Sequence, residues 1–484
     1  MTIRTVDFGR IDAEADENLS QYFVDTGVLG KLRSGRKHYV IGRKGSGKTA
    51  LFRLSNSQSL GRAVIPLEFN TYPWEMHKLV REQGLTPEAS YVASWRFVFL
   101  VSVCRYWAER AEGDLGGTAK KFLSSIFQTE QPGVLDILID RLKRLRKLQL
   151  PEATGIGKIG AVEFEPSKAG PVLAQTLSQW CQILDKFVFE NFDRMPCTIT
   201  LDKLDDGWDA KEESKLLLAG ALKATRDMNL RLHRRDAPAA IVTFLRSDIY
   251  GELEFNDKNK ISADIEFLEW PEENLFDVAA VRIARSLNCS KDEAWSRVFS
   301  SDEMRQRASI RSYMLKRTMG RPRDIVAFCL NCKEVAIKYN HDRVETSDVY
   351  EAEERYSRHI YDELIDEMHK QYPQASQYLR ALRNLGKTRF TLPEWKSASA
   401  GGHEEPSTAE EAVNRLKVLF EHSVVGIPRK GGAGGGTTHQ YAYNDRFLQP
   451  QFGEELVVHP SLKKHLQLVE PKRDKKEDTA EADE

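Results

Sequence analysis

This chain lacks the compositional features that mark several large protein classes. Its 484 residues contain 71 Lys and Arg against 72 Asp and Glu, for a net charge of −1. No global charge excess therefore attracts nucleic acid or an anionic membrane, and any basic site has to be a local patch. The longest apolar run, Phe97–Cys104, is much too short to cross a bilayer. Residues 1–9 lack the apolar segment of a signal peptide, so we expect a soluble, cytoplasmic protein without a membrane partner.

Cysteine is scarce, and its spacing argues against disulfide or metal chemistry. The six cysteines are scattered through apolar surroundings, which is typical of a protein in a reducing cytosol. Cys329 and Cys332 form a C-x-x-C pair, but no second Cys or His pair occurs at zinc spacing. The pair lies in a helical pattern, so packing in a core is its expected role.

One complete motif stands out against these absences. Residues 42–49 match G-x-x-x-x-G-K-[ST], with a predicted buried strand, Tyr39–Ile41, before them and a predicted helix start, Lys48–Leu54, after them. Successive backbone N–H groups in such a loop form an anion nest, to which the helix adds its positive end. Lys48 is expected to reach the β- and γ-phosphates of ATP, and the Thr49 hydroxyl to hold Mg²⁺. The expected nucleotide-binding residues are Gly42, Arg43, Lys44, Gly45, Ser46, Gly47, Lys48, Thr49 and Ala50.

A phosphate loop needs a carboxylate at the end of a neighbouring strand. The predicted strand Cys197–Leu201 is followed by Asp202, which is therefore the expected Mg²⁺ ligand, with a structural cap as the alternative. Many ATPases carry the water-activating acid directly after this aspartate, but here that position is Lys203. Asp205 or Asp206 would then have to polarise the water, or hydrolysis is slow.

Two arginines are candidates for contact with the phosphates. Arg246 follows the predicted strand Ala239–Leu245 and could sense the γ-phosphate, or it could pair with Asp248 in a structural role. Farther along, Pro322 lies in the first turn of a predicted helix that carries several arginines, of which Arg323 is the expected phosphate contact.

The remaining chain is read as an α/β nucleotide-binding core followed by smaller domains. We expect a P-loop domain with a parallel sheet over residues 1–270, including a second strand at Ala63–Phe69 and a helical lead-in at Ala13–Phe23. A helical insertion is expected at residues 85–195, since the stretch is too long for a connection. Its basic segment, Arg141–Lys147, fits a solvated helix about as well as a phosphate-binding face.

This ordered set of motifs resembles the AAA+ and STAND superfamily, in the branch of origin-recognition initiators, KAP ATPases and STAND switches. It is most similar to bacterial P-loop ATPases with a Gly-Arg-Lys-Gly-Ser-Gly-Lys-Thr loop. The resemblance assigns Walker A to residues 42–49, Walker B to Asp202, sensor 1 to Arg246 and sensor 2 to Gly320–Arg323. It implies ATP and Mg²⁺ as cofactors, a helical lid at residues 271–372 and assembly into a homo-oligomer. No Leu-Ser-Gly-Gly-Gln or Asn-Lys-x-Asp motif occurs, which disfavours ABC ATPases and GTPases.

Residues 373–468 resemble the winged-helix domain of origin-type relatives, and residues 469–484 form a charged tail that should be disordered. The expected helices and strands are Ala375–Leu382, Leu392–Trp395, Thr408–Phe420, Val424–Ile427 and Tyr441–Tyr443, around a wing tip at Gly431–Gly436. A DNA-reading third helix should begin with basic or amide side chains, but this one carries Glu410 and Glu411. Arg429 and Lys430 in the wing could touch phosphates, yet a protein-docking role is favoured over DNA.

The expected function is an ATP-driven switch, in which lid closure and oligomerisation signal to a partner or effector protein. The resemblance suggests a bacterial defence or stress module as its setting. No nuclease, protease or deaminase motif occurs, so effector chemistry would come from another protein. The alternative is a DNA-binding ATPase of initiator or repair type that uses the winged helix.

Overall fold

The structure is a computed structural model that describes residues 3–69, 87–127, 173–232, 237–400, 408–429, 438–450 and 452–470. The chain separates into two compact units. The first, called the core unit, contains Asp25–Arg43 and Lys48–Leu268. The second, called the C-terminal unit, contains Met1–Val24, Lys44–Gly47 and Glu269–Glu484.

A five-stranded parallel sheet with the order β2-β3-β4-β1-β5 forms the centre of the core unit. Its strands are β1 (Tyr39–Gly42), β2 (Ala63–Glu68), β3 (Cys197–Asp202), β4 (Ile241–Arg246) and β5 (Ile265–Phe267). Every residue of β1, β3 and β4 is buried, as expected for parallel strands that are covered on both faces. The predicted α/β fold with a parallel sheet is therefore confirmed.

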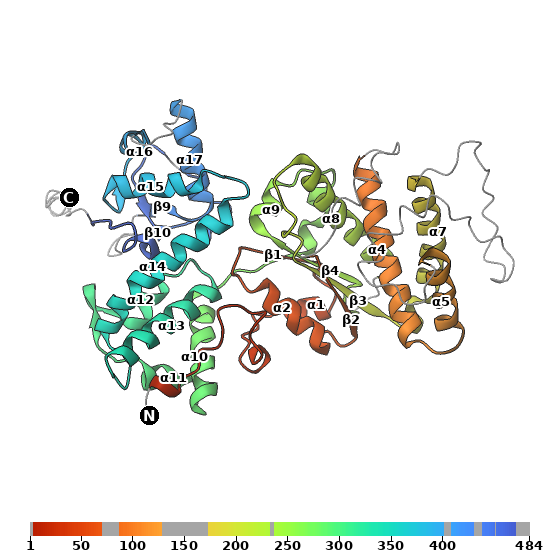
Figure 1. Ribbon diagram of the computed structural model, residues 1–484, viewed down its shortest axis with the longest axis horizontal. Coiled ribbons are helices and arrows are strands. Elements are labelled where there is room, and N and C mark those ends of the chain that lie inside the picture. Colours follow the sequence, from red (N-terminus) through yellow and green to blue (C-terminus); the bar gives the residue numbers. More distant parts are fainter. Residues whose placement is uncertain are drawn as a thin grey trace, which may run out of the picture. The chain divides into compact units, whose positions relative to one another are not determined.

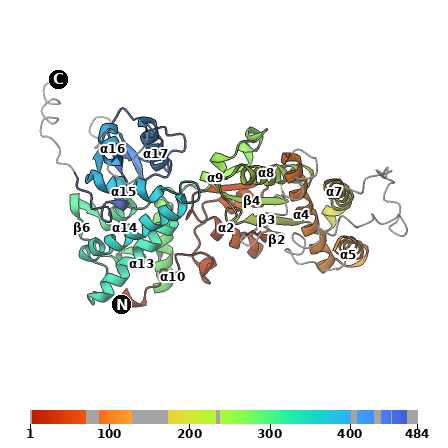
Figure 2. The ribbon, with the colours of Figure 1, turned by 45° about the horizontal axis from the view of Figure 1, so that its top comes forward.

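Helices cover the two faces of this sheet. Helices α1 (Val28–Arg33) and α2 (Lys48–Leu54) lie on one face, and α8 (Glu212–Leu232) and α9 (Ser247–Glu252) lie on the other (Figures 1 and 2). A π-helical turn, Ser55–Ser59, continues α2. The helix that begins at the phosphate loop thus packs directly on the sheet whose strand carries Asp202.

The described part of the predicted insertion between β2 and β3 is helical. It consists of α4 (Pro87–Arg110), α5 (Gly113–Phe127) and α7 (Leu173–Asn191), and α4 packs against α5, α7 and α8. Buried tryptophans join these helices to the core, since Trp95 Nε1 donates to Leu217 O over 2.9 Å. The basic segment Arg141–Lys147 lies outside the described residues.

Helices α4 and α8 approach so closely at Gly220 that a larger side chain there is expected to destabilise the protein. A Cβ added at Gly220 of α8 would lie 2.7 Å from Tyr91 Cβ, whereas one added at Gly117 of α5 would meet nothing within 4 Å. Gly220→Ala should therefore lower the stability of the protein by about 1–3 kcal/mol through overpacking. The matched Gly117→Ala should raise it by up to about 1 kcal/mol through helix propensity. Thermal unfolding of both variants checks these opposite signs, and a Gly220→Ala protein as stable as wild type would contradict the packing.

The C-terminal unit contains a group of helices formed by residues 272–368. These are α10 (Glu272–Leu287), α11 (Lys291–Val298), α12 (Ile310–Leu315), α13 (Pro322–Lys338) and α14 (Thr346–Met368), with a small hairpin of β6 (Glu303–Met304) and β7 (Ala308–Ser309). Ile3, Val6 and Phe8 are buried in the core of this unit. The N-terminal residues, which the sequence placed in the nucleotide domain, are thus grouped with the helices of the C-terminal unit.

The helical lead-in predicted at Ala13–Phe23 is not an α-helix; only a 3₁₀ turn, Leu19–Gln21, occurs there. Asp16 is buried and its carboxylate accepts hydrogen bonds from the Tyr22 hydroxyl and from the Asn18 backbone N–H. Such local bonds from an aspartate compete with the helical ladder. The apolar spacing in this segment therefore reflects packing on the C-terminal unit and not a helix.

Residues 375–470 form a helical and antiparallel fold that shares its core with the preceding helices. Its elements are α15 (Ala375–Leu385), β8 (Arg389–Phe390), α16 (Leu392–Ser399), α17 (Ala409–Glu421), β9 (Val425–Arg429), β10 (Thr438–Gln440) and β11 (Leu456–Val458), with the sheet order β10-β9-β11-β8. The three predicted helices and the first predicted strand are confirmed. The strand predicted at Tyr441–Tyr443 is wrong, because Tyr441 and Asn444 exchange hydrogen bonds in a turn. Lys430, Gly431–Gly436 and residues 471–484 lie outside the described residues.

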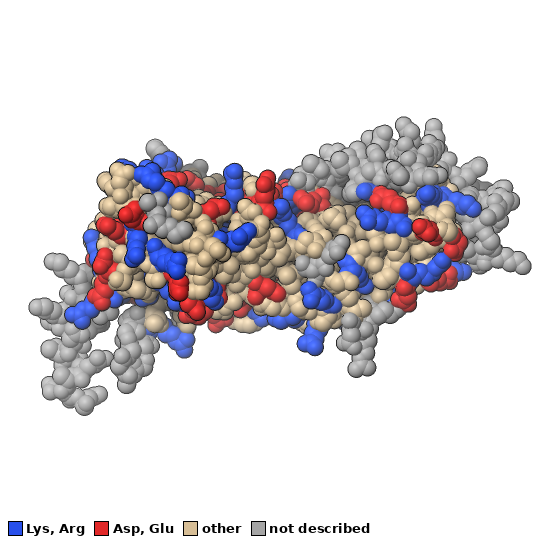
Figure 3. Space-filling model, turned by 90° about the horizontal axis from the view of Figure 1, so that it is seen from below, with Lys and Arg blue, Asp and Glu red and all other residues tan. Residues whose placement is uncertain are grey.

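The cysteines, the helix lengths and the surface charges can be compared with what the sequence predicted. Cys329 and Cys332 are buried in α13, which confirms their packing role, and burial raises the pKa of both thiols. None of the helices in the described residues combines the length and apolar character needed to cross a bilayer. On the face drawn in Figure 3, basic and acidic side chains are interspersed among the described residues.

Candidate functional site

The phosphate loop connects the buried strand β1 to α2. Gly45 and Gly47 have φ angles of +79° and +94°, a left-handed backbone that glycine adopts without strain. Such a turn points successive backbone N–H groups to one side, where they can surround an anion at the start of a helix. The backbone geometry therefore explains why positions 45 and 47 of the motif are glycine.

Lys48 is anchored at the base of this loop. Its ammonium donates to Gly42 O over 2.9 Å and to Arg43 O over 3.0 Å. Burial lowers the pKa of Lys48, while the charges of Asp205 and Asp202 oppose this shift. The predicted phosphate-binding lysine is thus held beside both predicted acids, which stabilise its positive charge.

Asp202 provides the clearest sign of a cation site. The side chain is only 3% exposed, and burial raises its pKa to about 6, against the opposing effects of Lys48 and of a hydrogen bond from Thr49. Its Oδ2 has no hydrogen-bond partner among the described residues. A buried, unpartnered carboxylate oxygen beside a threonine hydroxyl fits Mg²⁺, which takes one or two protein oxygens and completes its shell with phosphates and water.

This site is small for a metal centre. The described residues contain no group of three or more His, Cys, Asp or Glu side chains arranged to hold a metal ion. A resident zinc or calcium ion would require more protein ligands than Thr49 and Asp202 offer. The pair therefore suits a cation that arrives with a nucleotide.

Arg246 lies at the loop edge with its guanidinium already engaged. Its Cα pairs with that of Gly42 in the sheet register. Nε and Nη2 donate to the two carboxylate oxygens of Asp248 over 3.1 and 2.6 Å, and Nη1 lies 3.6 Å from Asp205 Oδ2. The structural pairing that the sequence left open is thus present, and it places Arg246 beside the second predicted acid.

The position after Asp202 brings in a residue that the sequence reading missed. Lys203 has a φ angle of +61°, and its ammonium lies 2.8 Å from Glu68 Oε2 at the end of β2. Glu68 is the register partner of Asp202. The sequence contained a signal for Glu68, since an acid ends this strand as Asp202 ends the other. Only the pairing of β2 with β3 in the sheet shows that the two acids are neighbours.

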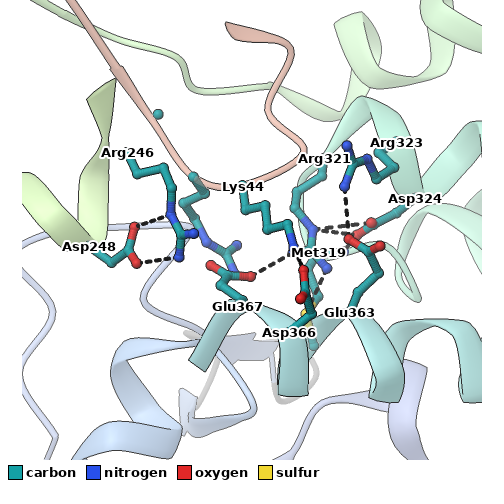
Figure 4. A network of polar contacts seen from close by, with 12 residues as sticks. Lys44, Arg246, Asp248, Met319, Arg321, Arg323, Asp324, Glu363, Asp366 and Glu367 are labelled. Carbon is teal, nitrogen blue, oxygen red and sulfur yellow. Dashed lines mark hydrogen bonds and ion pairs between the residues drawn. The ribbon is translucent and has the colours of Figure 1, made fainter. Parts of the chain in front are cut away.

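In the C-terminal unit, the arginines before and within the first turn of α13 differ in their environment (Figure 4). Arg321 is 1% exposed, and it donates to Asp324 over 3.1 Å and to Glu367 Oε2 over 3.1 Å. Arg323 is more accessible and donates to Glu363 Oε2 over 2.8 Å. The buried Arg321 is therefore held by two carboxylates of this unit, whereas the predicted Arg323 pairs with one carboxylate among the described residues.

The loop tip, Lys44–Gly47, is grouped with the same unit. The ammonium of Lys44 contacts the Asp366 carboxylate on α14 (Figure 4). Trp270 Nε1 donates to Ser46 O over 2.9 Å. A Cβ added at Gly45 would lie 3.4 Å from Arg323 Cβ. The predicted sensor arginine and the tip of the predicted loop are thus brought together.

Comparison with protein families gives one match in this region. Residues 273–365, which run from the start of α10 into the last turn of α14, match the family described as the FunZ-associated C-terminal helical domain. A search of the curated proteins found no match.

Among solved structures, the chain is similar to Cdc6p from Pyrobaculum aerophilum, with 10% identity, a TM-score of 0.32 and coverage of 96% of each chain. It is also similar to the ORC2 protein of Aeropyrum pernix in ADPNP–ADP complexes, with 13% identity, a TM-score of 0.37 and coverage of 94% and 91%. The ADP form of that protein has 13% identity, a TM-score of 0.30 and coverage of 96% and 95%.

Proposed function

We propose that this protein is a Mg²⁺-dependent, ATP-binding and ATP-hydrolysing switch of the AAA+ and STAND type. One observation carries the proposal. Lys48 and Thr49 of the phosphate loop lie beside Asp202, whose buried Oδ2 has no hydrogen-bond partner among the described residues. Phosphoryl transfer requires a loop that binds the phosphates, a lysine that neutralises their charge and side chains that can hold Mg²⁺.

Each residue of the site has a task in this proposal. The loop N–H groups bind the phosphate oxygens, and Lys48 moves from the carbonyls of Gly42 and Arg43 to the β- and γ-phosphates. Thr49 and Asp202 would hold Mg²⁺, which when bound neutralises charge on the phosphate oxygens. Arg246 senses the γ-phosphate from the end of β4, and Asp205 orients Arg246 and Lys48 by its charge.

The contacts of the loop tip support coupling between nucleotide and the helices of the C-terminal unit. Lys44 is paired with Asp366 and Arg323 with Glu363. Phosphates that bind the loop compete with these carboxylates for the two cations, because each cation is partly accessible and binds phosphate and carboxylate alike. Release of α14 by ATP would then signal to a second copy of the chain and to a protein partner or effector, in a setting such as bacterial defence or stress.

A DNA-binding ATPase of initiator or repair type is the second candidate. The helices α15 to α17 followed by the antiparallel strands β9 to β11 support a winged-helix-like interpretation of residues 375–470. However, α17 begins with Glu410 and Glu411 in its first turn, where phosphates would be repelled. Docking of a protein is therefore favoured over binding of DNA.

The test measures ATPase rate and oligomer mass with and without single- and double-stranded DNA. We expect ATP to change the mass of the particle and DNA to leave the rate within about twofold, since no phosphate contacts are proposed. A DNA-stimulated rate that is lost at high salt, as counterion release requires, would favour the second candidate instead.

A further inference from the structure

We propose that Glu68, the last residue of β2, accepts the proton of the water that attacks the γ-phosphate. This assignment rests on the proposed ATP hydrolysis. It gives Glu68 the role that many ATPases give to an acid at the position of Lys203, and that the sequence suggested for Asp205. It follows from the pairing of β2 with β3, from the contact between Glu68 and Lys203, and from the different surroundings of Asp205.

Strand register places Glu68 on the correct side of the sheet. Glu68 and Asp202 are register partners in adjacent parallel strands, which run about 4.8 Å apart, so their side chains leave the sheet on the same face. Asp202 accepts a hydrogen bond from the Thr49 hydroxyl in the first turn of α2. The carboxylate of Glu68 is therefore directed to the face on which the phosphate loop continues into its helix.

Exposure and pairing suit Glu68 to this task. Its side chain is 44% exposed, so a water molecule can reach it, while Asp202 beside it is buried. Lys203 holds the carboxylate at 2.8 Å and limits its rotamers. The left-handed backbone at Lys203 turns the chain directly after β3, which brings this lysine to the neighbouring strand. Glu68 thus lies at the end of β2, and the lysine that holds it lies directly after β3.

Asp205 is in a different environment. Its carboxylate lies 3.6 Å from Arg246 Nη1, and its charge is the largest of the acidic influences on Lys48. Asp205 is thus engaged with two cations of the phosphate site, whereas Glu68 contacts Lys203 and has a side chain that is 44% exposed to water. Asp205 is therefore better suited to position Arg246 and Lys48.

The proposed step is the hydrolysis of the bond between the γ-phosphorus and the β–γ bridging oxygen of ATP. The water oxygen forms a bond to the γ-phosphorus while one of its protons passes to the Glu68 carboxylate. The bond from the γ-phosphorus to the bridging oxygen breaks, and its electron pair leaves with ADP. The products are ADP and inorganic phosphate, and the proton on Glu68 returns to solvent through the exposed side of the carboxyl group.

The test compares Glu68→Gln with wild type in ATP affinity, phosphate release and the nucleotide extracted from the purified protein. We expect affinity within about threefold and turnover lower by at least about 100-fold, as for loss of a general base. Extraction should yield ATP where wild type yields ADP. The matched control is Glu252→Gln, since Glu252 is 43% exposed and lies 3.0 Å from Lys215 in the same unit. Its turnover should stay within about twofold of wild type.

A second variant separates proton transfer from anchoring of Lys203. If Glu68 only holds Lys203, Lys203→Met should lose as much turnover as Glu68→Gln, and that result would overturn the proposal. We expect Lys203→Met to keep at least about a tenth of the wild-type turnover, since the carboxylate remains. Turnover of Glu68→Gln within about threefold of wild type would also overturn it.

Two further outcomes have to be told apart: a Glu68→Gln variant that does not bind ATP, and a wild-type protein without ATP binding or hydrolysis. If Glu68→Gln fails to bind ATP, Glu68→Asp decides, because it keeps the charge and shortens the side chain by one methylene. Retained binding with reduced turnover supports the proposal, and unchanged turnover rejects it. A wild-type protein that neither binds nor hydrolyses ATP would instead reject the proposed function itself, before any variant is compared.

Discussion

Lys48→Ala protein is expected to bind ATP at least about 100-fold more weakly than wild type, with no measurable hydrolysis. The ammonium is partly buried at the base of the loop and is supported by the charges of Asp205 and Asp202. Each hydrogen bond between a charged donor and a phosphate contributes about 1.5–3 kcal/mol, so loss of two such bonds accounts for the effect. Equilibrium binding of a fluorescent ATP analogue measures it directly.

The matched control for this variant is Lys31→Ala. Lys31 lies on α1 in the same unit, is 44% exposed on its side chain and pairs with Glu266 over 2.6 Å. Its replacement should leave ATP affinity unchanged, because the surface pair contributes little to the fold. Circular dichroism of both variants verifies folding. If Lys48→Ala bound ATP as well as Lys31→Ala did, the phosphate loop would lose its assigned role.

Asp202→Asn is expected to stabilise the nucleotide-free protein at neutral pH. Burial raises the pKa of Asp202 from 3.8 to about 6. A raised pKa in the folded state contributes stability that is fully present below the unfolded value and is lost as pH rises through about 6. Wild type should therefore lose up to about 3 kcal/mol between pH 4 and pH 7 that the asparagine variant keeps.

Thermal unfolding at two pH values measures this difference. Near pH 7.5, at which Asp202 is charged, the variant should unfold a few degrees above wild type, and near pH 4 the two should coincide. The control is Asp257→Asn, since Asp257 is a surface residue paired with Lys260. A variant that unfolds below wild type at both pH values would show that the carboxylate stabilises the fold and does not strain it.

The same substitution should remove the response to Mg²⁺. In wild type, Mg²⁺ added with ATP is expected to raise the unfolding temperature above that with ATP alone, because ligands stabilise the state they bind. In Asp202→Asn this increment should vanish, and hydrolysis should fall by at least about 100-fold with the loss of the cation. An undiminished Mg²⁺ increment would place the cation ligand elsewhere.

Local patterns were sufficient for the elements that contain the loop. The buried strand at Tyr39, the helix that begins at Lys48 and the strand that ends at Asp202 all form where short-range patterning predicted them. Such features depend on neighbouring residues alone, since apolar strands, glycine turns and helix starts are local properties. The same reasoning failed at Ala13–Phe23, where buried Asp16 binds Tyr22 and lies near Arg282 far along the chain.

The sequence by itself determined that this chain has a complete phosphate loop and that acids and arginines end its strands. Only the tertiary structure decided which of these side chains meet. Glu68 and Asp202 are far apart in the chain, and they become partners because β2 and β3 pair in parallel. The N-terminal residues join the C-terminal helices for the same reason, since burial of Ile3, Val6 and Phe8 depends on surfaces supplied by distant residues. Local sequence carries no record of strand order, and the candidate proton acceptor depends on it.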